Sequence, residues 1–202
     1  MRILGLDMST SCGWAILDDG VLEAKGLINV KDDFKPDVSI IQDFLFIDKA
    51  DKVAQEIRKL AKLYTPDFVY IEQTNSGSFR TSQKMLEFIH YSVLKMFREV
   101  NYETKIKYVD TSAWRAKHKI FMSKDDKKNN KMVKDGKKRG KITKKHLAVK
   151  WANATYSLAL KLKDNDIAEA LAIASYGFSK ERSRVSASIN LDAIFSNGEA
   201  NV

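Results

Sequence analysis

Alternating apolar segments and turn signals at the start of the chain predict three consecutive strands. Arg2 to Leu6 is short and apolar and is followed at once by Asp7, which is typical of a buried strand that ends at a charged residue. Cys12 to Leu17 is a second apolar segment. A DDG turn signal comes next, so we expect Val21 to Val30 to return as the third strand, in a hairpin.

Helical and strand-like patterns alternate through the rest of the chain. Apolar residues recur at helical spacing in several segments, and two short apolar segments between them are typical of buried strands. The expected helices cover residues 48–63, 82–100, 143–162 and 166–178, with a short helix capped by Thr111, and the expected strands cover residues 68–71 and 106–109. This order predicts an α/β fold with a mixed five-stranded sheet, antiparallel in one half and parallel in the other, flanked by helices.

The length of 202 residues suits one domain with its own core. We expect that domain to cover residues 1–178, with an insertion at 121–141, and residues 179–202 to form a flexible polar tail. The sequence has no apolar run of the roughly 18–20 residues that cross a bilayer, and we expect no signal peptide. The single cysteine, Cys12, excludes an internal disulfide and a cysteine zinc site. These features predict a cytoplasmic protein with no membrane partner.

The net charge of +9 is concentrated in one segment. Residues 117–150 contain 14 Lys or Arg and three Asp, a net of +11, whereas the rest of the chain contains 21 basic and 23 acidic residues. Residues 123–141 have almost no apolar content and are predicted to form a mobile, solvated loop or arm. Such a segment either increases solubility or binds a polyanion, most often nucleic acid, through its phosphates.

Two predicted strands end in a carboxylate. Asp7 ends the first strand and is followed by a small polar turn, and Glu72 closes the strand that begins at Phe68. The carboxyl ends of strands are where open α/β sheets bind ligands, so the two acids are expected at one edge of the sheet. Taken singly, Asp7 is better explained as a charged residue where the strand leaves the core, and Glu72 is equally well explained as a solvated strand end.

A second pair of acids begins the last predicted helix. Asp166 and Glu169 are three residues apart and therefore lie on one helix face, one turn from each other. Acids in a first turn also stabilise the helix dipole, but Asp164 or Asn165 can supply the cap without them. The alanine-rich remainder of the helix allows close packing on the sheet, which would hold both acids near the strand ends.

Four clustered carboxylates need a cation to neutralise their repulsion. Without cysteine or suitably spaced histidine ligands, the set suits a hard divalent ion, Mg²⁺ or Mn²⁺, bound through oxygen. Two such ions about 3.5–4 Å apart clamp the attacking and leaving oxygens of a phosphoryl transfer. The acids therefore predict phosphodiester chemistry with two metal ions and no nucleotide cofactor. The basic segment is predicted to bind the substrate.

Three motifs carry a resemblance to a known family. GLDMSTSCGWAI near the start, VYIEQ in the middle and DIAEALAIA near the end resemble the RuvC family of Holliday-junction resolvases, which belongs to the ribonuclease H-like superfamily. The resemblance covers residues 1 to about 178 in order and spacing, and the lysine-rich insertion is most similar to phage-encoded members. It implies a ribonuclease H-like sheet and a function in the cytoplasm of the host cell.

The resemblance also implies roles for individual residues. Asp7, Glu72, Asp166 and Glu169 are implied to be the metal-binding catalytic acids of a crossover junction endodeoxyribonuclease, a homodimer that cuts two opposed strands of a four-way DNA junction. Candidate dimer contacts are the apolar residues Phe88, Tyr91 and Leu94. Candidate DNA-binding residues are Arg115, Lys117, Lys137, Lys138, Arg139, Lys144 and Lys145.

The sequence departs from the family pattern in two motifs. Glu169 stands where the family usually has Asp, and Asp164 is the alternative ligand at that helix start. Some relatives have an aromatic wedge just after the VYIEQ glutamate, whereas this chain has Thr74 and Asn75, with Phe79 as the nearest aromatic residue. The alternatives are a ribonuclease H-like nuclease acting on flaps or RNA–DNA hybrids and a DNA-binding protein without catalysis.

Overall fold

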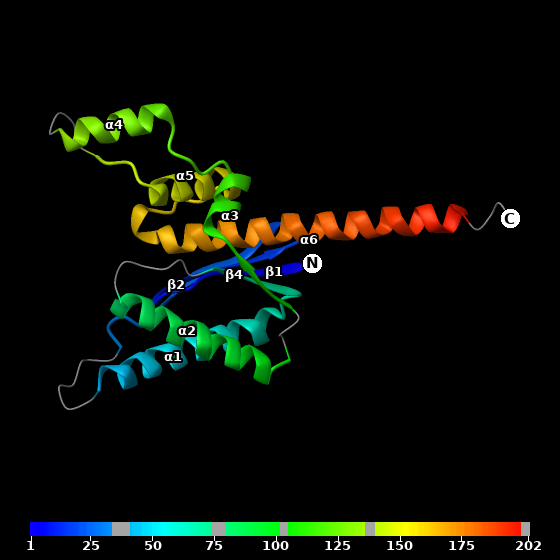
Figure 1. Cartoon of the computed structure of the whole chain (residues 1–202), viewed down its shortest axis with the longest axis horizontal. Helices are drawn as coiled ribbons and strands as arrows, with labels where there is room; N and C mark the ends of the chain where they lie inside the picture. The colour runs from blue at the N-terminus through cyan, green and yellow to red at the C-terminus, as the bar shows by residue number, and fades with distance from the viewer. Residues whose placement is uncertain (34–40, 74–79, 102–104, 136–139, 199–202) are drawn as a thin grey trace.

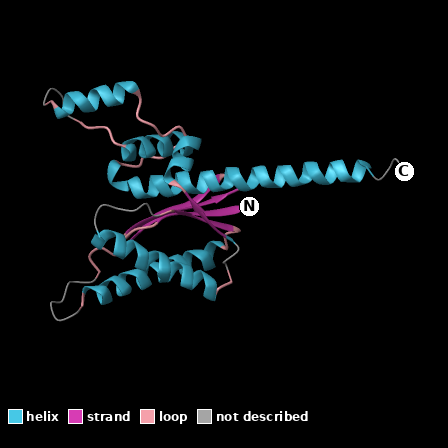
Figure 2. Cartoon of the chain, in the orientation of Figure 1, coloured by secondary structure: helices cyan, strands magenta, loops and turns pink. Residues whose placement is uncertain are grey.

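The structure is a computed structural model that describes residues 1–33, 41–73, 80–101, 105–135 and 140–198, with the side chains of 189–198 left out of the description. Its centre is a five-stranded sheet in the order β3-β2-β1-β4-β5 (Figure 2). β1 pairs antiparallel with β2, and β2 with β3, whereas β4 pairs parallel with β1 and with β5. The strands are β1 (Arg2–Asp7), β2 (Ser11–Asp18), β3 (Val21–Asn29), β4 (Phe68–Glu72) and β5 (Ile106–Val109). The predicted mixed α/β sheet is therefore confirmed.

Helices cover both faces of the sheet (Figure 1). One face carries α1 (Gln42–Tyr64) and α2 (Arg80–Glu99), and the other carries α6 (Asn165–Gly198). Two short helices, α3 (Thr111–Lys117) and α5 (Lys144–Tyr156), pack against α6. Successive strand side chains point to opposite faces, so Leu4 and Leu6 join the core under α1 and α2, while Ile3 joins the core under α6.

The start of α6 lies unusually close to the sheet. A Cβ atom on Gly13 would lie 1.9 Å from the carbonyl oxygen of Asp166, and one on Gly5 would lie 2.4 Å from that of Ala170. Only glycine permits a backbone approach of this kind. Small side chains on the helix complete the fit, because Ala168, Ala170, Ala172 and Ala174 are all fully buried. The first turn of α6 is thereby held beside the carboxyl end of β1.

The lysine-rich insertion contains a helix where the sequence predicts a loop. α4 (Lys124–Lys134) begins with a capping box, in which the Ser123 hydroxyl accepts from the backbone N–H of Asp126 and the Asp126 carboxylate accepts from that of Ser123. This pair satisfies two otherwise unpaired helix donors. The prediction of an arm without regular structure is therefore wrong for residues 124–134.

α6 continues twenty residues past its predicted end at residue 178, to Gly198. The predicted loose tail is wrong for this part, and residues 199–202 lie outside the description. A buried network favours the continuation, because the Tyr70 hydroxyl donates to Glu181, which is only 5% exposed and pairs with Arg184 at 2.7 Å. Despite the length of α6, no helix among the described residues combines the length and the apolar character that crossing a membrane requires.

Two other helix boundaries differ from the prediction by about six residues each. α1 begins at Gln42 rather than residue 48, and α5 ends at Tyr156 rather than residue 162. Ser157 has a left-handed backbone with φ of 52° and caps α5. The Asn153 side chain then exchanges two hydrogen bonds with the backbone of Leu160, which turns the chain away from the helix before the 3-10 turn η2 (Leu162–Asp164).

Candidate active site

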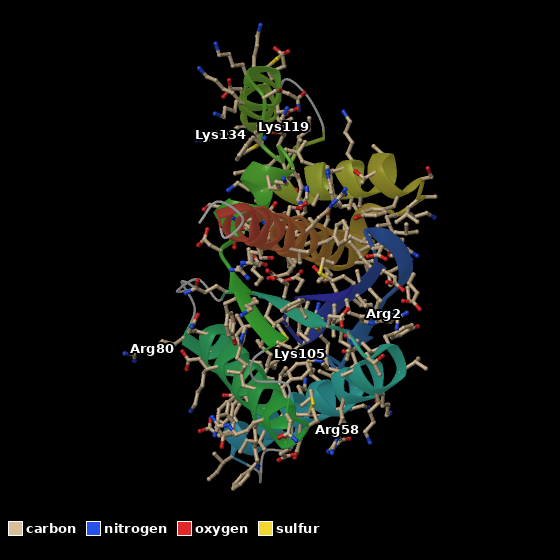
Figure 3. The ribbon with its side chains drawn as sticks, turned by 90° about the vertical axis from the view of Figure 1, so that its right-hand side faces the viewer. Arg2, Arg58, Arg80, Lys105, Lys119 and Lys134 are labelled. Atoms are coloured by element: carbon tan, nitrogen blue, oxygen red, sulfur yellow. The ribbon has the colours of Figure 1, made fainter. Side chains whose placement is uncertain are left out.

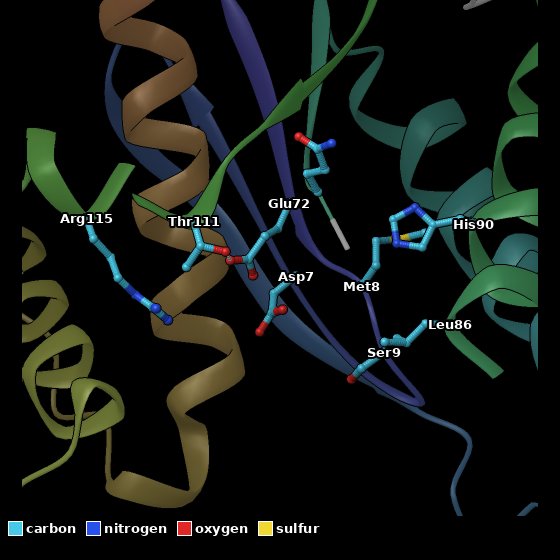
Figure 4. A pocket seen from close by; sticks show the side chains of 9 residues that line it. Asp7, Met8, Ser9, Glu72, Leu86, His90, Thr111 and Arg115 are labelled. Carbon is cyan, nitrogen blue, oxygen red and sulfur yellow. Dashed lines mark hydrogen bonds between the residues drawn. The ribbon is translucent and has the colours of Figure 1, made fainter. Parts of the chain in front are cut away.

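Asp7 and Glu72 lie at the same edge of the sheet because β1 and β4 are parallel neighbours. Leu6 is in register with Ile71, so the next residue on each strand is the predicted acid. Both carboxylates line a cavity of about 340 Å³. Figure 4 shows them facing this space together with Thr111 and Arg115. The expected juxtaposition of the two strand-end acids is present.

The first turn of α6 adds two more acids. One carboxylate oxygen from each of Asp7, Asp166 and Glu169 lies within 4.8 Å of the other two. The close approach of Gly13 to the Asp166 backbone brings this helix turn to the end of β1. The alternative ligand, Asp164, has a different role, because its carboxylate accepts from the backbone N–H of Lys161 at 2.8 Å.

The negative charges of the clustered carboxylates repel one another. Burial raises the pKa of Asp7 well above its ordinary value, and the charges of Glu169, Glu72 and Asp166 raise it further. Burial also raises the pKa of Glu169, which is only partly offset by the neighbouring Arg115. A site that holds several carboxylates ionised at neutral pH therefore requires additional positive charge.

The donor set fits a hard divalent cation. The three clustered residues offer carboxylate oxygens and no sulfur or imidazole nitrogen. Oxygen-only sites suit Mg²⁺ or Mn²⁺, with water completing the coordination. Asp7, Asp166 and Glu169 would hold such an ion, and Glu72 lines the same cavity.

Two predicted DNA-binding residues contact the acid cluster. The Arg115 guanidinium donates to Glu169 at 2.8 Å, and these side chains are 17% and 7% exposed. The Lys145 ammonium lies 3.6 Å from the Asp166 carboxylate. Lys117 and Lys144 are exposed at the end of α3 and the start of α5. Lys137, Lys138 and Arg139 lie outside the described residues, as do Thr74, Asn75 and Phe79.

Glu72 is held by two residues that sequence reasoning did not connect with it. The Thr111 hydroxyl donates to its carboxylate, and the Trp114 indole donates to the same oxygen at 3.4 Å. Thr111 was predicted to cap α3, but the cap is Asp110, whose side chain accepts from the backbone N–H of Ser112 at 2.6 Å. The Asp-Thr-Ser sequence is the signal that identifies Asp110 as the cap and leaves Thr111 available.

His90 forms part of the cavity wall. Its Nδ1 atom lies 2.9 Å from the Tyr108 hydroxyl, and the two rings stack with centroids 5.7 Å apart. Burial lowers the pKa of His90, which favours the neutral ring.

Comparisons of the sequence with known proteins give no match for this chain. No protein-family model matches it, and no curated protein matches it in sequence.

Solved structures do match the fold. RuvC from T. thermophilus, in complex with a Holliday junction substrate, has a TM-score of 0.60 at 11% identity, covering 90% of this chain and 96% of that one. A second Thermus thermophilus RuvC structure has a TM-score of 0.58 at 12% identity, covering 91% and 97%. The yeast mitochondrial Holliday junction resolvase Ydc2 has a TM-score of 0.51 at 14% identity, covering 87% and 77%. The chain therefore has a RuvC-like, ribonuclease H-like fold along most of its length.

Proposed function

We propose that this protein is a divalent-metal-dependent endodeoxyribonuclease that resolves four-way DNA junctions. The observation that carries the proposal is the group of three carboxylates within 4.8 Å of one another at the carboxyl edge of a RuvC-like sheet. The RuvC structure that is solved with a Holliday junction covers 90% of this chain, so most of the chain has a structural counterpart in that protein.

In this proposal Asp7, Glu72, Asp166 and Glu169 hold two metal ions. Mg²⁺ or Mn²⁺ bound there supplies the Lewis-acid chemistry of phosphodiester hydrolysis. Thr111 and Trp114 orient the Glu72 carboxylate. Arg115 neutralises part of the charge on Glu169 and keeps that side chain aimed at the cluster. The cavity of about 340 Å³ beside Asp7 and Glu72 receives the scissile phosphate group.

Basic residues around the cavity are proposed to hold the DNA backbone. Lys144 and Lys145 lie in the first turn of α5, and Lys145 already lies beside Asp166. Lys117 is exposed at the end of α3. The predicted contacts of Lys137, Lys138 and Arg139 belong to the same proposal. Contacts of this kind position a duplex without reading its sequence.

We further propose that the active form is a homodimer, since a four-way junction presents two equivalent strands. On α2, Tyr91 is 65% exposed and Leu94 is 38% exposed. Phe88 instead packs inward, with its ring centroid 6.3 Å from that of Phe46. Tyr91 and Leu94 are therefore better candidates for a contact between copies than Phe88. The cytoplasmic location stays a prediction.

The proposal is tested by a cleavage assay on a labelled four-way junction beside duplex, three-way, flap and RNA–DNA hybrid substrates, with Mg²⁺, Mn²⁺ or a chelator. We expect paired symmetric nicks in the junction that are lost with the chelator. Glu72→Gln should abolish cleavage and retain binding, whereas Asp48→Asn, at an exposed position of α1, should cut normally.

Each contrary result has a defined meaning. Preferential cutting of flaps or hybrids would contradict junction resolution. The protein would then be a different nuclease that uses the same acids. Junction binding without any metal-dependent cutting would contradict the enzymatic proposal and favour a DNA-binding protein. Normal cutting by Glu72→Gln would contradict the assignment of the site.

A further inference from the structure

All five lysines of α4 lie on one exposed face. Successive residues of an α-helix are separated by about 100°, so positions 124, 127, 128, 131 and 134 fall within an arc of about 120°. Each of these lysines is exposed, and no ion pair of theirs occurs among the described residues. Figure 3 shows the side chains of this helix spreading into open space, with Lys134 at its edge. The name "lysine face" is used below for these five residues.

The opposite face of α4 is anchored by polar contacts. Its partly buried residues are Asp126, Asn129, Asn130 and Val133, and no residue of the helix is fully buried. The Asn130 side chain donates to the backbone oxygen of Ile142 at 2.7 Å and accepts from its N–H at 2.8 Å. This pair of bonds sets the orientation of α4, a role that apolar packing plays in an ordinary surface helix.

The lysine face lies at the same end of the molecule as the acid cluster. In Figure 1, α4 lies beyond α5, toward the end where α6 begins. Ile142, to which Asn130 of α4 is hydrogen-bonded, lies two residues before the start of α5, and in the first turn of α5 Lys145 lies 3.6 Å from Asp166. Basic side chains therefore extend from the catalytic acids outward to α4.

We propose that α4 is a preformed DNA-binding helix whose lysine face contacts the phosphates of a duplex arm. The position of that arm rests on the proposed function, because the same DNA places its scissile phosphate at the acid cluster. The 11 residues of α4 span about 16 Å, and duplex DNA carries one phosphate charge per about 1.7 Å of its axis. Lysine binds phosphate as a point charge, whereas paired contacts to base edges are typical of arginine. The contact is therefore independent of DNA sequence.

The test measures binding of the full-length protein to a labelled four-way junction in EDTA, at 50–300 mM salt, by fluorescence anisotropy. The arm variant carries Lys124→Gln, Lys128→Gln and Lys131→Gln. The matched control carries Lys59→Gln, Lys62→Gln and Lys95→Gln on α1 and α2, which cover the other face of the sheet. Because three phosphate contacts are lost, we expect the arm variant to bind about tenfold more weakly near 150 mM salt, with a salt slope smaller by about 2 to 3. The control should change binding less than twofold.

The variant Asn130→Ala distinguishes DNA binding by an oriented helix from DNA binding by positive charge alone. It leaves the net charge unchanged and removes both bonds to Ile142, so we expect weaker junction binding at every salt concentration. Unchanged binding by Asn130→Ala would overturn the claim that α4 is preformed. Equal effects of the arm and control variants, or losses that depend on DNA sequence, would overturn the assignment of the lysine face.

The outcome is separable from that of the proposed function because the binding assay contains no cleavage step. A protein that binds the junction through α4 and never cuts would contradict only the proposed nuclease. If the protein cuts junctions and the arm substitutions do not change its junction binding, only this inference is contradicted.

Discussion

Asp7 is the residue at which folding and function conflict most directly. It is placed by β1 in a partly buried position beside three other acids, and desolvation of its carboxylate is the largest cause of its raised pKa. A carboxyl group whose folded pKa lies above its unfolded value stabilises the fold at low pH. That contribution is lost as the pH rises from the ordinary Asp value through the raised one. Near neutral pH, the ionised Asp7 therefore lowers the free energy of unfolding of the metal-free protein.

Asp7→Asn should remove this destabilisation, and it should also remove the stabilisation of the protein by Mg²⁺. In EDTA near pH 7 we expect its melting temperature to exceed that of the wild type by roughly 2–4 °C, equivalent to about 1 kcal/mol. Mg²⁺ should raise the melting temperature of the wild type and leave that of Asp7→Asn unchanged. Calorimetry or thermal fluorescence provides the measurement, with the exposed Asp48→Asn as the control. A lower melting temperature for Asp7→Asn in EDTA would contradict this account.

α6 is the element that completes the site, and its position depends on glycine in the facing strands. Gly13 on β2 allows the backbone of Asp166 to approach so closely that no Cβ fits. The same helix turn contributes two of the three clustered acids. A shift of this turn would therefore change the metal site while leaving the rest of the sheet in place.

Gly13→Ala should displace the first turn of α6. We expect a loss of about 1–3 kcal/mol of unfolding free energy, because the added methyl group overlaps the Asp166 backbone. Stabilisation by Mg²⁺ should be lost as well, which urea unfolding with and without the ion will show. Gly140→Ala is the control, since a Cβ there would meet no atom of the described residues within 4 Å and its positive φ of 88° is unfavourable. Gly140→Ala should retain the full stabilisation by Mg²⁺. If Gly13→Ala also retains it, the packing argument is contradicted.

The whole molecule has two differently built sides. The acid cluster, the first turn of α5 and the lysine face of α4 lie at one end, which suits a branched polyanion. The layer formed by α1 and α2 instead exposes apolar side chains, including Tyr91 and Leu94. This separation allows one copy to bind DNA and a second copy through different surfaces.

The double variant Tyr91→Glu with Leu94→Glu should weaken the proposed dimer. Charge at these exposed positions would be buried on association, so we expect a shift from dimer to monomer in sedimentation equilibrium. The two nicks in one junction should then become uncoupled. Leu63→Glu, at a 71% exposed position of α1, is the control. A wild type that is monomeric at micromolar concentration, alone and with a junction, would contradict the dimer.

Local patterns account for much of what sequence reasoning predicted. The short apolar segment predicted the first strand, and the position of Asp7 directly after that segment marked the end of the strand. Helical spacing placed Asp166 and Glu169 on one face. α4 was missed because its helix depends on a cap and on Asn130, with no apolar face to reveal it. The continuation of α6 was missed because it is favoured by Tyr70, which is distant in sequence.

The sequence by itself determined the five strands and their mixed pairing, the acids at two strand ends and one helix start, and the concentration of positive charge in one segment. Those properties follow from periodicity and composition, which act over a few residues. Only the tertiary structure decided that Arg115 pairs with Glu169, that Thr111 holds Glu72, and that the lysines of α4 share the end of the molecule where the acids meet. Such contacts join segments far apart in the chain, and their partners are chosen by how the helices pack on the sheet.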